Sequence, residues 1–391
     1  MPNAWQFMGL PETERNGAHE ALNRLEQIVL KSGAIQEAAA YIKQQGWNQP
    51  IIVADEHTYL AAGKQLNELL EAQGIWARVC LIEPNEQGDV IADEVAMMQL
   101  FVEADPERTD CLIAAGSGTL HDITRFVSLH GQIPFVSVPT APSVDGFTSA
   151  GAPIILRGIK KTIQATAPVA IFADLNILKE APQRLVAAGF GDMLGKYTSL
   201  FDWKVSHLTA DEPYSDPIAE ITERALLSCV DQVDEIGKRS EAGIKALMTA
   251  LIESGIAMLL FGQSHPASGA EHHVSHYWEM EYLQRGERQL LHGAKVGAAC
   301  AEIVRLYHEA LDHKTYPGAK PSIVDQYGEQ LAAWIRQVPE ESVIRELMRR
   351  AGGPSSRVDL GIDDTLLARS LREAHEVRLN RHTLLRALNE A

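Results

Sequence analysis

Three side chains of metal-ligating types are the strongest chemical signal in this sequence. Asp192 ends the run AAGFGD, His272 lies in SGAEHHVSH, and His292 lies in LLHGAK. Carboxylate and imidazole groups bind borderline divalent metals, and three protein ligands leave coordination positions for a substrate. The set therefore predicts an open, catalytic metal site. Because the chain has 14 histidines, ordinary core or surface histidines are the competing interpretation.

A fourth residue, His276, follows His272 by four positions. On a helix the two side chains share a face, so one can bind a metal while the other binds what the metal binds. The same spacing occurs in zinc proteases, whose HExxH pattern needs Glu directly after the first His. Here His273 occupies that position and Glu271 precedes the pair, so a metalloprotease is not predicted.

A glycine-containing turn follows an apolar run at residues 111–115, with the sequence GSGTLHD and then a helical pattern. Free amides at such a helix N-terminus favour an anion, typically a pyrophosphate. The turn departs from GxGxxG because His121 stands at the third glycine position, and it follows a late strand. A nucleotide-phosphate site and a plain strand-to-helix turn, with Asp122 serving the helix terminus, both remain open.

A second loop, PTAPSVDGFTS, also follows an apolar strand. Ligands of open α/β sheets bind at the carboxyl ends of strands, and Asp145 in this loop can accept hydrogen bonds from a hydroxylated substrate. The alternative is that Asp145 and Gly146 only make a turn.

The elements that must position these residues divide the chain in two. Short β-branched runs alternate with amphipathic stretches from residue 28 to 174, which is typical of a parallel sheet with crossover helices. The expected strands are residues 51–54, 77–82, 111–115, 134–138, 152–156, 161–165 and 170–173, with a hairpin turning at 157–160, and the expected helices are 58–73, 90–103 and 120–130. After Pro182 long helical patterns dominate. We expect two lobes that share a cleft, with the boundary near Ala181.

Composition excludes several classes of protein. The 391 residues carry a formal net charge of −17, which disfavours nucleic-acid or membrane-surface binding. The four cysteines form no CxxC pair, as expected for reduced thiols in the cytoplasm. The first residues show no basic leader followed by an apolar run, and the apolar stretch 246–261 is interrupted by polar residues, so we expect a buried helix there and no membrane insertion.

Taken together, GSGTLHD, PTAPSVDGFTSAGAP, AAGFGDMLGK, SGAEHHVSH and LLHGAKVG resemble the glycerol-1-phosphate dehydrogenase family, most closely its bacterial branch. That family lies within the metal-dependent group of glycerol dehydrogenase, iron-type alcohol dehydrogenases and dehydroquinate synthase. The resemblance spans nearly the whole chain and is strongest over residues 110–297.

The resemblance implies a dehydroquinate synthase-like fold: an α/β NAD-binding lobe at residues 1–180 and an all-α metal- and substrate-binding lobe at 181–391, with the active site in the cleft. It implies one divalent metal, Ni²⁺ or Zn²⁺, on Asp192, His272 and His292. Substrate would contact Asp145, Asp192 and His276, of which Asp192 and His276 would be catalytic. The residues implied to contact the cofactor, NAD(H) or NADP(H), are Asp55, Gly116, Ser117, Gly118, Thr119, Leu120, Thr140, Ala141, Pro142, Ser143 and Ser149.

The implied reaction is the reversible reduction of dihydroxyacetone phosphate to sn-glycerol 1-phosphate, which feeds glycerolipid synthesis, in a homo-oligomer that is most simply a dimer. The metal would polarise the carbonyl, and His276 or water would supply the proton. Asp55 would accept a hydrogen bond from a ribose 2′-hydroxyl and repel a 2′-phosphate, which favours NADH. Lys196 and the basic run 157–161 are candidate phosphate partners, although Lys160 and Lys161 also fit solvated surface lysines.

Three alternatives remain. A glycerol or other polyol dehydrogenase would act on an unphosphorylated substrate. A lyase resembling dehydroquinate synthase would be expected to have Glu at the position of Asp192. A catalytically silent scaffold would be under no pressure to retain Asp192, His272 and His292.

Overall fold

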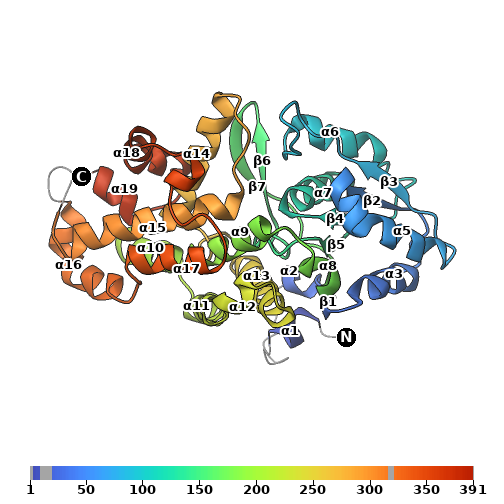
Figure 1. Ribbon diagram of the computed structural model, residues 1–391, viewed down its shortest axis with the longest axis horizontal. Coiled ribbons are helices and arrows are strands. Elements are labelled where there is room, and N and C mark those ends of the chain that lie inside the picture. The colour runs from blue at the N-terminus through green and yellow to red at the C-terminus, as the bar shows by residue number, and fades with distance from the viewer. Residues whose placement is uncertain (1–2, 9–19, 316–320, 391) are drawn as a thin grey trace.

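A computed structural model describes residues 3–8, 20–315 and 321–390. Figure 1 shows two halves side by side, one built around a β-sheet and the other of packed helices, with a β-hairpin standing between them. The alternation of strands and helices up to residue 174 and the helical remainder confirm the predicted architecture.

The sheet has six strands in the order β1-β8-β5-β4-β2-β3, and every neighbouring pair is parallel. The strands are β1 (Gln27–Lys31), β2 (Pro50–Ala54), β3 (Arg78–Leu81), β4 (Cys111–Gly116), β5 (Phe135–Pro139) and β8 (Ala170–Asp174). After β2 the chain moves outward to β3 and then returns to β4 on the other side of β2. Such a reversal opens a crevice at the carboxyl ends of the strands, where α/β sheets bind ligands.

Helices cover both faces of the sheet because its strands are apolar on both sides. Helices α3 (Ala34–Gln44) and α5 (Lys64–Glu71) pack on the face that carries Ile52 and Ile113, and α6 (Glu94–Glu103) and α7 (Gly118–Gly131) pack on the other. The helix predicted at 58–73 begins instead with α4 (Glu56–Thr58) and a π-helical turn at Tyr59–Gly63.

The predicted hairpin is confirmed as a separate two-stranded antiparallel sheet of β6 (Gly151–Leu156) and β7 (Ile159–Gln164). Its turn consists of Arg157 and Gly158, both with positive φ.

The helical half begins directly after β8. Its helices are α8 (Leu175–Lys179), α9 (Gln183–Leu194), α10 (Lys196–Ala210), α11 (Asp216–Asp231), α12 (Val233–Gly237), α13 (Glu241–Phe261), α14 (Ala270–Gln284), α15 (His292–Leu311), α16 (Ser322–Ile335), α17 (Glu341–Arg350), α18 (Asp364–Glu373) and α19 (Leu384–Asn389), with 3₁₀ turns at Val358–Leu360 and Ala374–Arg378.

Helix α13 is the apolar segment that the sequence predicts to be buried. It is long and apolar enough to cross a membrane, but 61% of its most apolar window is buried inside the fold. The short helices α1 (Ala4–Phe7) and α2 (Glu20–Asn23) contribute Trp5 and Leu22 to the same core as α13. These two N-terminal helices therefore pack with the helical half.

Candidate functional site

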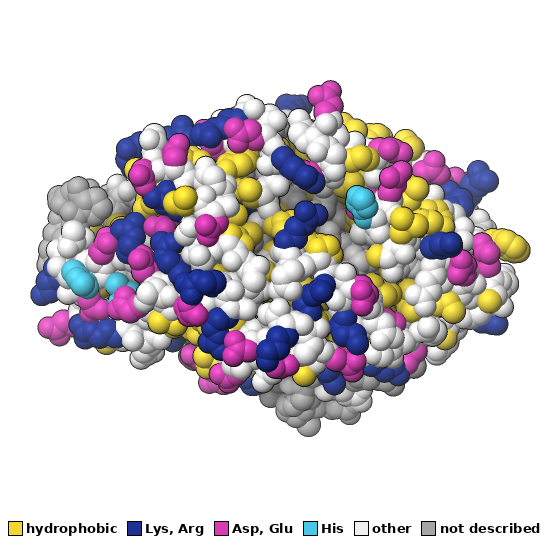
Figure 2. Space-filling view, viewed as in Figure 1, with side chains coloured by type: hydrophobic (Ala, Val, Ile, Leu, Met, Phe, Trp, Pro, Cys, Tyr) yellow, Lys and Arg dark blue, Asp and Glu magenta, His cyan; other side chains and the backbone are white. Residues whose placement is uncertain are grey.

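A cavity of about 470 Å³ lies between the two halves. The sheet half lines it with the loops after β2 and β4 and with the hairpin, and the helical half lines it with α14 and the start of α15. Figure 2 shows a hollow between the halves, with Lys and Arg side chains along it. This is the cleft at the carboxyl edge of the sheet that the topology predicts.

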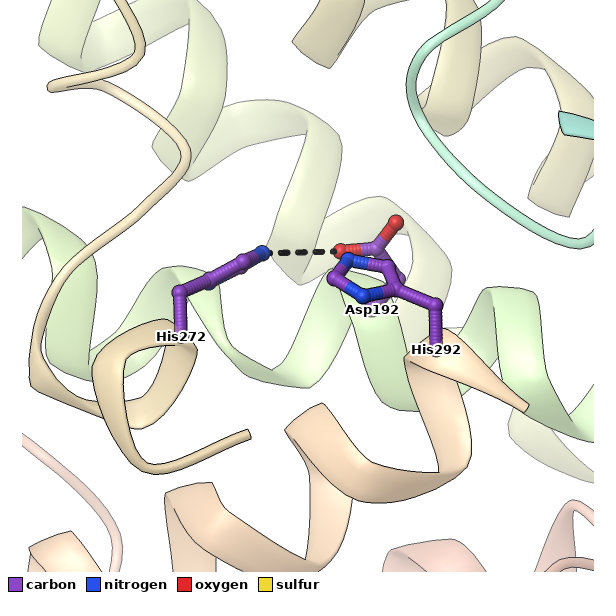
Figure 3. Close-up of side chains that lie close together, drawn as sticks. All are labelled: Asp192, His272 and His292. Atoms are coloured by element: carbon purple, nitrogen blue, oxygen red, sulfur yellow. Dashed lines mark ion pairs between the residues drawn. The ribbon is translucent and has the colours of Figure 1, made fainter. Parts of the chain in front are cut away.

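Asp192, His272 and His292 converge from three different helices, α9, α14 and α15 (Figure 3). His272 and His292 line the cavity, and Asp192 is fully buried beside them. One ligand atom from each lies within 4.8 Å of the other two, and His272 Nε2 is 3.7 Å from Asp192 Oδ1. The structure thus brings the three predicted ligands together, and their binding of a metal stays a prediction.

Close helix packing brings two of these ligands together. Helices α9 and α15 cross at glycines, and a Cβ on Gly293 would lie 1.8 Å from the carbonyl oxygen of Ala188. Only glycine permits this approach. The crossing places His292, at the first position of α15, beside Asp192 near the end of α9.

The hydrogen bonds around His272 suit a metal ligand. Its Nδ1 lies 2.6 Å from Glu271 Oε1, so a proton on Nδ1 donates to the carboxylate and Nε2 presents its lone pair toward Asp192. Glu271 also accepts bonds from Thr198 Oγ1 at 2.6 Å and from the Gly269 amide at 2.7 Å. Burial would raise the pKa of Glu271, but these three bonds outweigh it and lower that pKa, so Glu271 is ionised.

His292 is the second imidazole of the cluster. Burial, followed by the charge of Lys160, holds its pKa well below the usual value. Its Nδ1 is buried and has no hydrogen-bond partner among the described residues. A carboxylate, an oriented imidazole and an unsatisfied imidazole fit a divalent metal.

Beneath the cluster Lys196 joins two carboxylates. Its Nζ lies 2.7 Å from Asp145 Oδ2 and 3.1 Å from Asp192 Oδ1. The Asp145 amide donates to Asp192 Oδ2 at 3.0 Å, and Ser254 Oγ donates to Asp145 at 2.8 Å. Burial opposes the charge of Lys196, but the two aspartates outweigh it and raise its pKa. Because Lys196 is fully buried and paired, the structure contradicts its prediction as a phosphate partner.

His276 lines the same cavity, and its ring centroid lies 6.1 Å from that of His272 and 5.9 Å from that of His292. Burial, followed by the charges of Lys160 and Arg378, holds its pKa well below the usual value. His276 is therefore a neutral imidazole that can donate through one nitrogen and accept through the other.

The glycine turn meets the cleft at the start of α7, with Ser117, Gly118, Thr119 and Leu120 in the lining. Ser117 is the N-cap residue of α7 but makes no side-chain capping bond, so the first amides of the helix are not capped by it. His121 is buried and bridges Ser117 O at 2.9 Å and Ser137 Oγ at 2.7 Å. Burial lowers its pKa to about 3, so His121 is neutral. At the position of the third glycine of GxGxxG it therefore has a structural role, linking the turn to β5.

Of the other predicted cofactor residues, Asp55 and Ser149 line the cleft. Asp55 also caps α4, accepting from the Thr58 amide at 2.7 Å. Gly116 lies at the end of β4, where its carbonyl accepts the Thr140 amide at 3.0 Å. Thr140, Ala141, Pro142 and Ser143 are buried, and neither they nor Gly116 are in the cavity lining, so their contact with a cofactor stays a prediction.

Four residues of the site were not predicted as site residues. Glu271 orients His272, and Glu279, Lys295 and Arg378 line the wall nearest the hairpin. Lys160 was a candidate phosphate partner, with a solvated surface lysine as the alternative. Its side chain is only 8% exposed and bonds Glu279, whereas Lys161 is exposed. Of these four residues, only Glu271 gave a signal in the sequence, because it directly precedes the predicted ligand His272.

Comparison with known proteins places the chain in a family. Residues 29–182 match the model of the family described as iron-containing alcohol dehydrogenase. A Geobacillus stearothermophilus protein named glycerol-1-phosphate dehydrogenase (NAD(P)+) is 48% identical over 94% of this chain and 93% of its own length. A protein of the same name from Bacillus subtilis (strain 168) is 43% identical over 94% of this chain and 92% of its own.

Solved structures share the fold. The structure of a probable glycerol dehydrogenase from Sinorhizobium meliloti 1021 superposes with a TM-score of 0.67 at 18% identity, covering 93% of this chain and 92% of that one. By its sequence similarity over nearly its full length, the chain belongs to the glycerol-1-phosphate dehydrogenase family, within the iron-containing alcohol dehydrogenase group.

Proposed function

We propose that this chain catalyses the NAD(P)-linked, metal-dependent interconversion of dihydroxyacetone phosphate and sn-glycerol 1-phosphate. The observation that carries the proposal is the convergence of Asp192, His272 and His292 in a cleft that also contains the glycine turn of the sheet half. Relatives 43–48% identical to the chain bear the corresponding name. Lewis-acid and hydride chemistry need these two features side by side.

We infer that Asp192, His272 and His292 hold one divalent metal, Ni²⁺ or Zn²⁺. When bound, such a metal polarises a carbonyl oxygen, and a nicotinamide cofactor carries the hydride. Glu271 fixes the tautomer of His272 and so directs its Nε2 toward the ion site.

The remaining side chains orient the substrate and move the proton. Asp145 accepts a hydrogen bond from a substrate hydroxyl, and Lys196 holds the Asp145 and Asp192 side chains in place. His276, neutral and inside the cleft, donates or receives the proton at an imidazole nitrogen, directly or through water.

The cofactor is proposed to lie along the sheet edge. The first amides of α7 face its pyrophosphate, together with the predicted contacts of Gly116 to Leu120, Thr140 to Ser143 and Ser149. Residues 1–180 are the proposed NAD-binding lobe, residues 181–391 hold metal and substrate, and the enzyme is proposed to act as a cytoplasmic homodimer in glycerolipid synthesis.

The proposal is tested by following NADH absorbance with dihydroxyacetone phosphate and with dihydroxyacetone. The enzyme is first stripped by chelator and then refilled with Ni²⁺ or Zn²⁺, with Asp192→Asn as the variant impaired in metal binding. Turnover of the phosphorylated ketone that returns with metal supports the proposal. Preference for dihydroxyacetone would reassign the chain to the polyol dehydrogenases, and absence of turnover with either metal would refute it.

Cofactor preference is predicted from Asp55. Asp55→Asn keeps an N-cap side chain for α4 and removes the carboxylate that would repel a 2′-phosphate. We expect the variant to bind NADPH more tightly relative to NADH than the wild type does, by about 10-fold. Equal KM ratios for the two cofactors in variant and wild type would exclude this role for Asp55.

A further inference from the structure

A second, polar cavity of about 360 Å³ adjoins the metal cleft. The two cavities share Lys160 and Thr162 of the hairpin, Ser264 of the segment before α14, His276, and Arg378. His276 therefore stands between the predicted metal ligands and a wall that carries two cations.

Arg378 belongs to the 3₁₀ turn Ala374–Arg378, and no carboxylate of the described part of the chain forms an ion pair with it. Its guanidinium donates instead to three hydroxyls: Ser268 Oγ at 3.1 Å, Ser264 Oγ at 3.3 Å and Thr162 Oγ1 at 3.1 Å. Burial lowers its pKa to about 10, so it stays charged near neutral pH while partly desolvated. A half-buried guanidinium without a carboxylate partner is well suited to bind an anion.

Lys160 adds a second cation at this wall. It shares the carboxylate of Glu279 with Lys295, both at 2.8 Å, so one negative charge serves two ammonium groups. With Arg378 included, these four side chains carry three positive charges and one negative charge, a net of +2. This local excess of positive charge contrasts with the net charge of −17 on the whole chain.

His276 connects the metal cluster with the cationic wall. His276 lines both cavities and lies about 6 Å, ring to ring, from His272 and from His292. A substrate bound at the metal cluster therefore has a continuous path past His276 to the cationic wall. The pyrophosphate of the cofactor is expected elsewhere, at the start of α7 in the sheet half.

We propose that Arg378 and Lys160 bind the phosphate group of the substrate, with the hydroxyls of Thr162, Ser264 and Ser268 completing the subsite. The proposal rests on the proposed function and deepens it by assigning the residues that select a phosphorylated ketone. A planar guanidinium fork matches two phosphate oxygens, and an ammonium supplies a point charge for the third.

The test compares the wild type with Arg378→Gln and Lys160→Gln, each loaded with metal, using dihydroxyacetone phosphate and dihydroxyacetone. Arg372→Gln is the matched control, because Arg372 lies six residues before Arg378, outside both cavities, and pairs on the surface with Glu373. We expect each cleft variant to raise KM for the phosphorylated ketone by about 10- to 100-fold. Because both substrates share the metal site and His276, the decisive readout is the difference between them: kcat/KM for dihydroxyacetone phosphate should fall at least about 10-fold more than kcat/KM for dihydroxyacetone.

Arg378→Lys, which keeps the charge but not the fork, should recover part of the affinity. If Arg378→Gln and Lys160→Gln leave KM for the phosphorylated ketone unchanged, or impair dihydroxyacetone equally, the subsite is wrong. Circular dichroism of each variant separates loss of fold from loss of the phosphate contact.

A failure of the proposed function would be seen first, as a wild type that turns over no dihydroxyacetone phosphate. Titration calorimetry with inorganic phosphate then decides the subsite alone. Binding to the wild type that Arg378→Gln weakens by about 10-fold or more supports a site for some other phosphorylated molecule. Equal phosphate affinity of the two proteins, or no binding to either, overturns it.

Discussion

Glu271 shows how much a single buried residue contributes to the site. Its carboxylate accepts hydrogen bonds from His272 Nδ1, the Thr198 hydroxyl and the Gly269 amide, all within 2.7 Å. Each partner fixes the carboxylate in a different direction, so the imidazole cannot rotate without breaking a charge-assisted bond. The lone pair of His272 Nε2 is thereby held toward Asp192 before any ion arrives.

Glu271→Gln is predicted to weaken metal binding about 10- to 100-fold, because the amide no longer draws the His272 proton onto Nδ1 as strongly. Competition between the stripped protein and a metal-sensitive dye measures the affinity without an activity assay. Glu281→Gln is the control, since Glu281 lies on the same helix α14 but pairs with Arg285 and Arg369 at the surface. Unchanged metal affinity in Glu271→Gln would mean that its bond to His272 is only structural.

At the scale of elements, the crossing of α9 and α15 sets the distance between Asp192 and His292. A Cβ on Gly293 would lie 1.8 Å from Ala188 O, and one on Gly191 would lie 2.3 Å from Gly293 O. A methyl group between two backbones in such close contact would push the helices apart and so move Asp192 or His292.

Gly293→Ala is predicted to destabilise the fold by about 1–3 kcal/mol and to lower metal affinity, because α15 must shift away from α9. Urea unfolding and dye competition measure the two effects. Gly328→Ala in α16 is the control: its Cβ would meet only the flexible Val324 side chain at 3.1 Å, and alanine favours a helix by up to about 1 kcal/mol. Wild-type metal affinity in Gly293→Ala would show that the crossing does not set the site.

The sequence predicted those elements whose pattern is strong over their whole length. Strands β2 and β4 are continuous buried runs, and they lie close to the predicted bounds. β1 and α3 were not predicted as separate elements: only Ile28, Val29 and Leu30 of QIVLK are apolar, and α3 follows almost directly after this short run.

The candidate site was predictable only where residue type alone carries chemistry. Asp192, His272 and His292 could be recognised because their side chains are of metal-binding types and lie in short segments rich in glycine and histidine. Arg378 does not, because its role depends on the absence of a neighbouring carboxylate in the described part of the folded chain and on a hairpin 216 residues away in sequence.

At the scale of the whole molecule, charge and burial are distributed unevenly. The chain is acidic overall, yet Lys and Arg side chains lie along the hollow between the halves (Figure 2). Focused positive potential in a cleft attracts anionic substrates, and the acidic remainder keeps polyanions such as nucleic acid away.

All four cysteines are buried and free, which makes them probes of global opening. Burial raises the pKa of Cys80 to about 11, and it raises the pKa of Cys111 well above the ordinary value, so little thiolate exists at pH 8. We predict no fast reaction of the native protein with a thiol reagent at pH 8, and reaction of all four thiols in denaturant. A higher pH should speed labelling, since it increases the thiolate fraction. Fast labelling of one or more thiols per chain in the native protein would contradict the burial of the cysteines.

The strand order also determines when each strand can pair while the chain is being synthesised. β1 has one neighbour in the sheet, β8, and in their parallel register Lys31 lies opposite Asp174. A ribosome makes the intervening stretch in on the order of ten seconds. During that time β2, β3, β4 and β5 can assemble while β1 has no place beside them, and α13, one of the helices that pack on β1, emerges later still. The first strand to be translated can therefore pair in the sheet only after β8 has been made, and until then its edge stays unpaired.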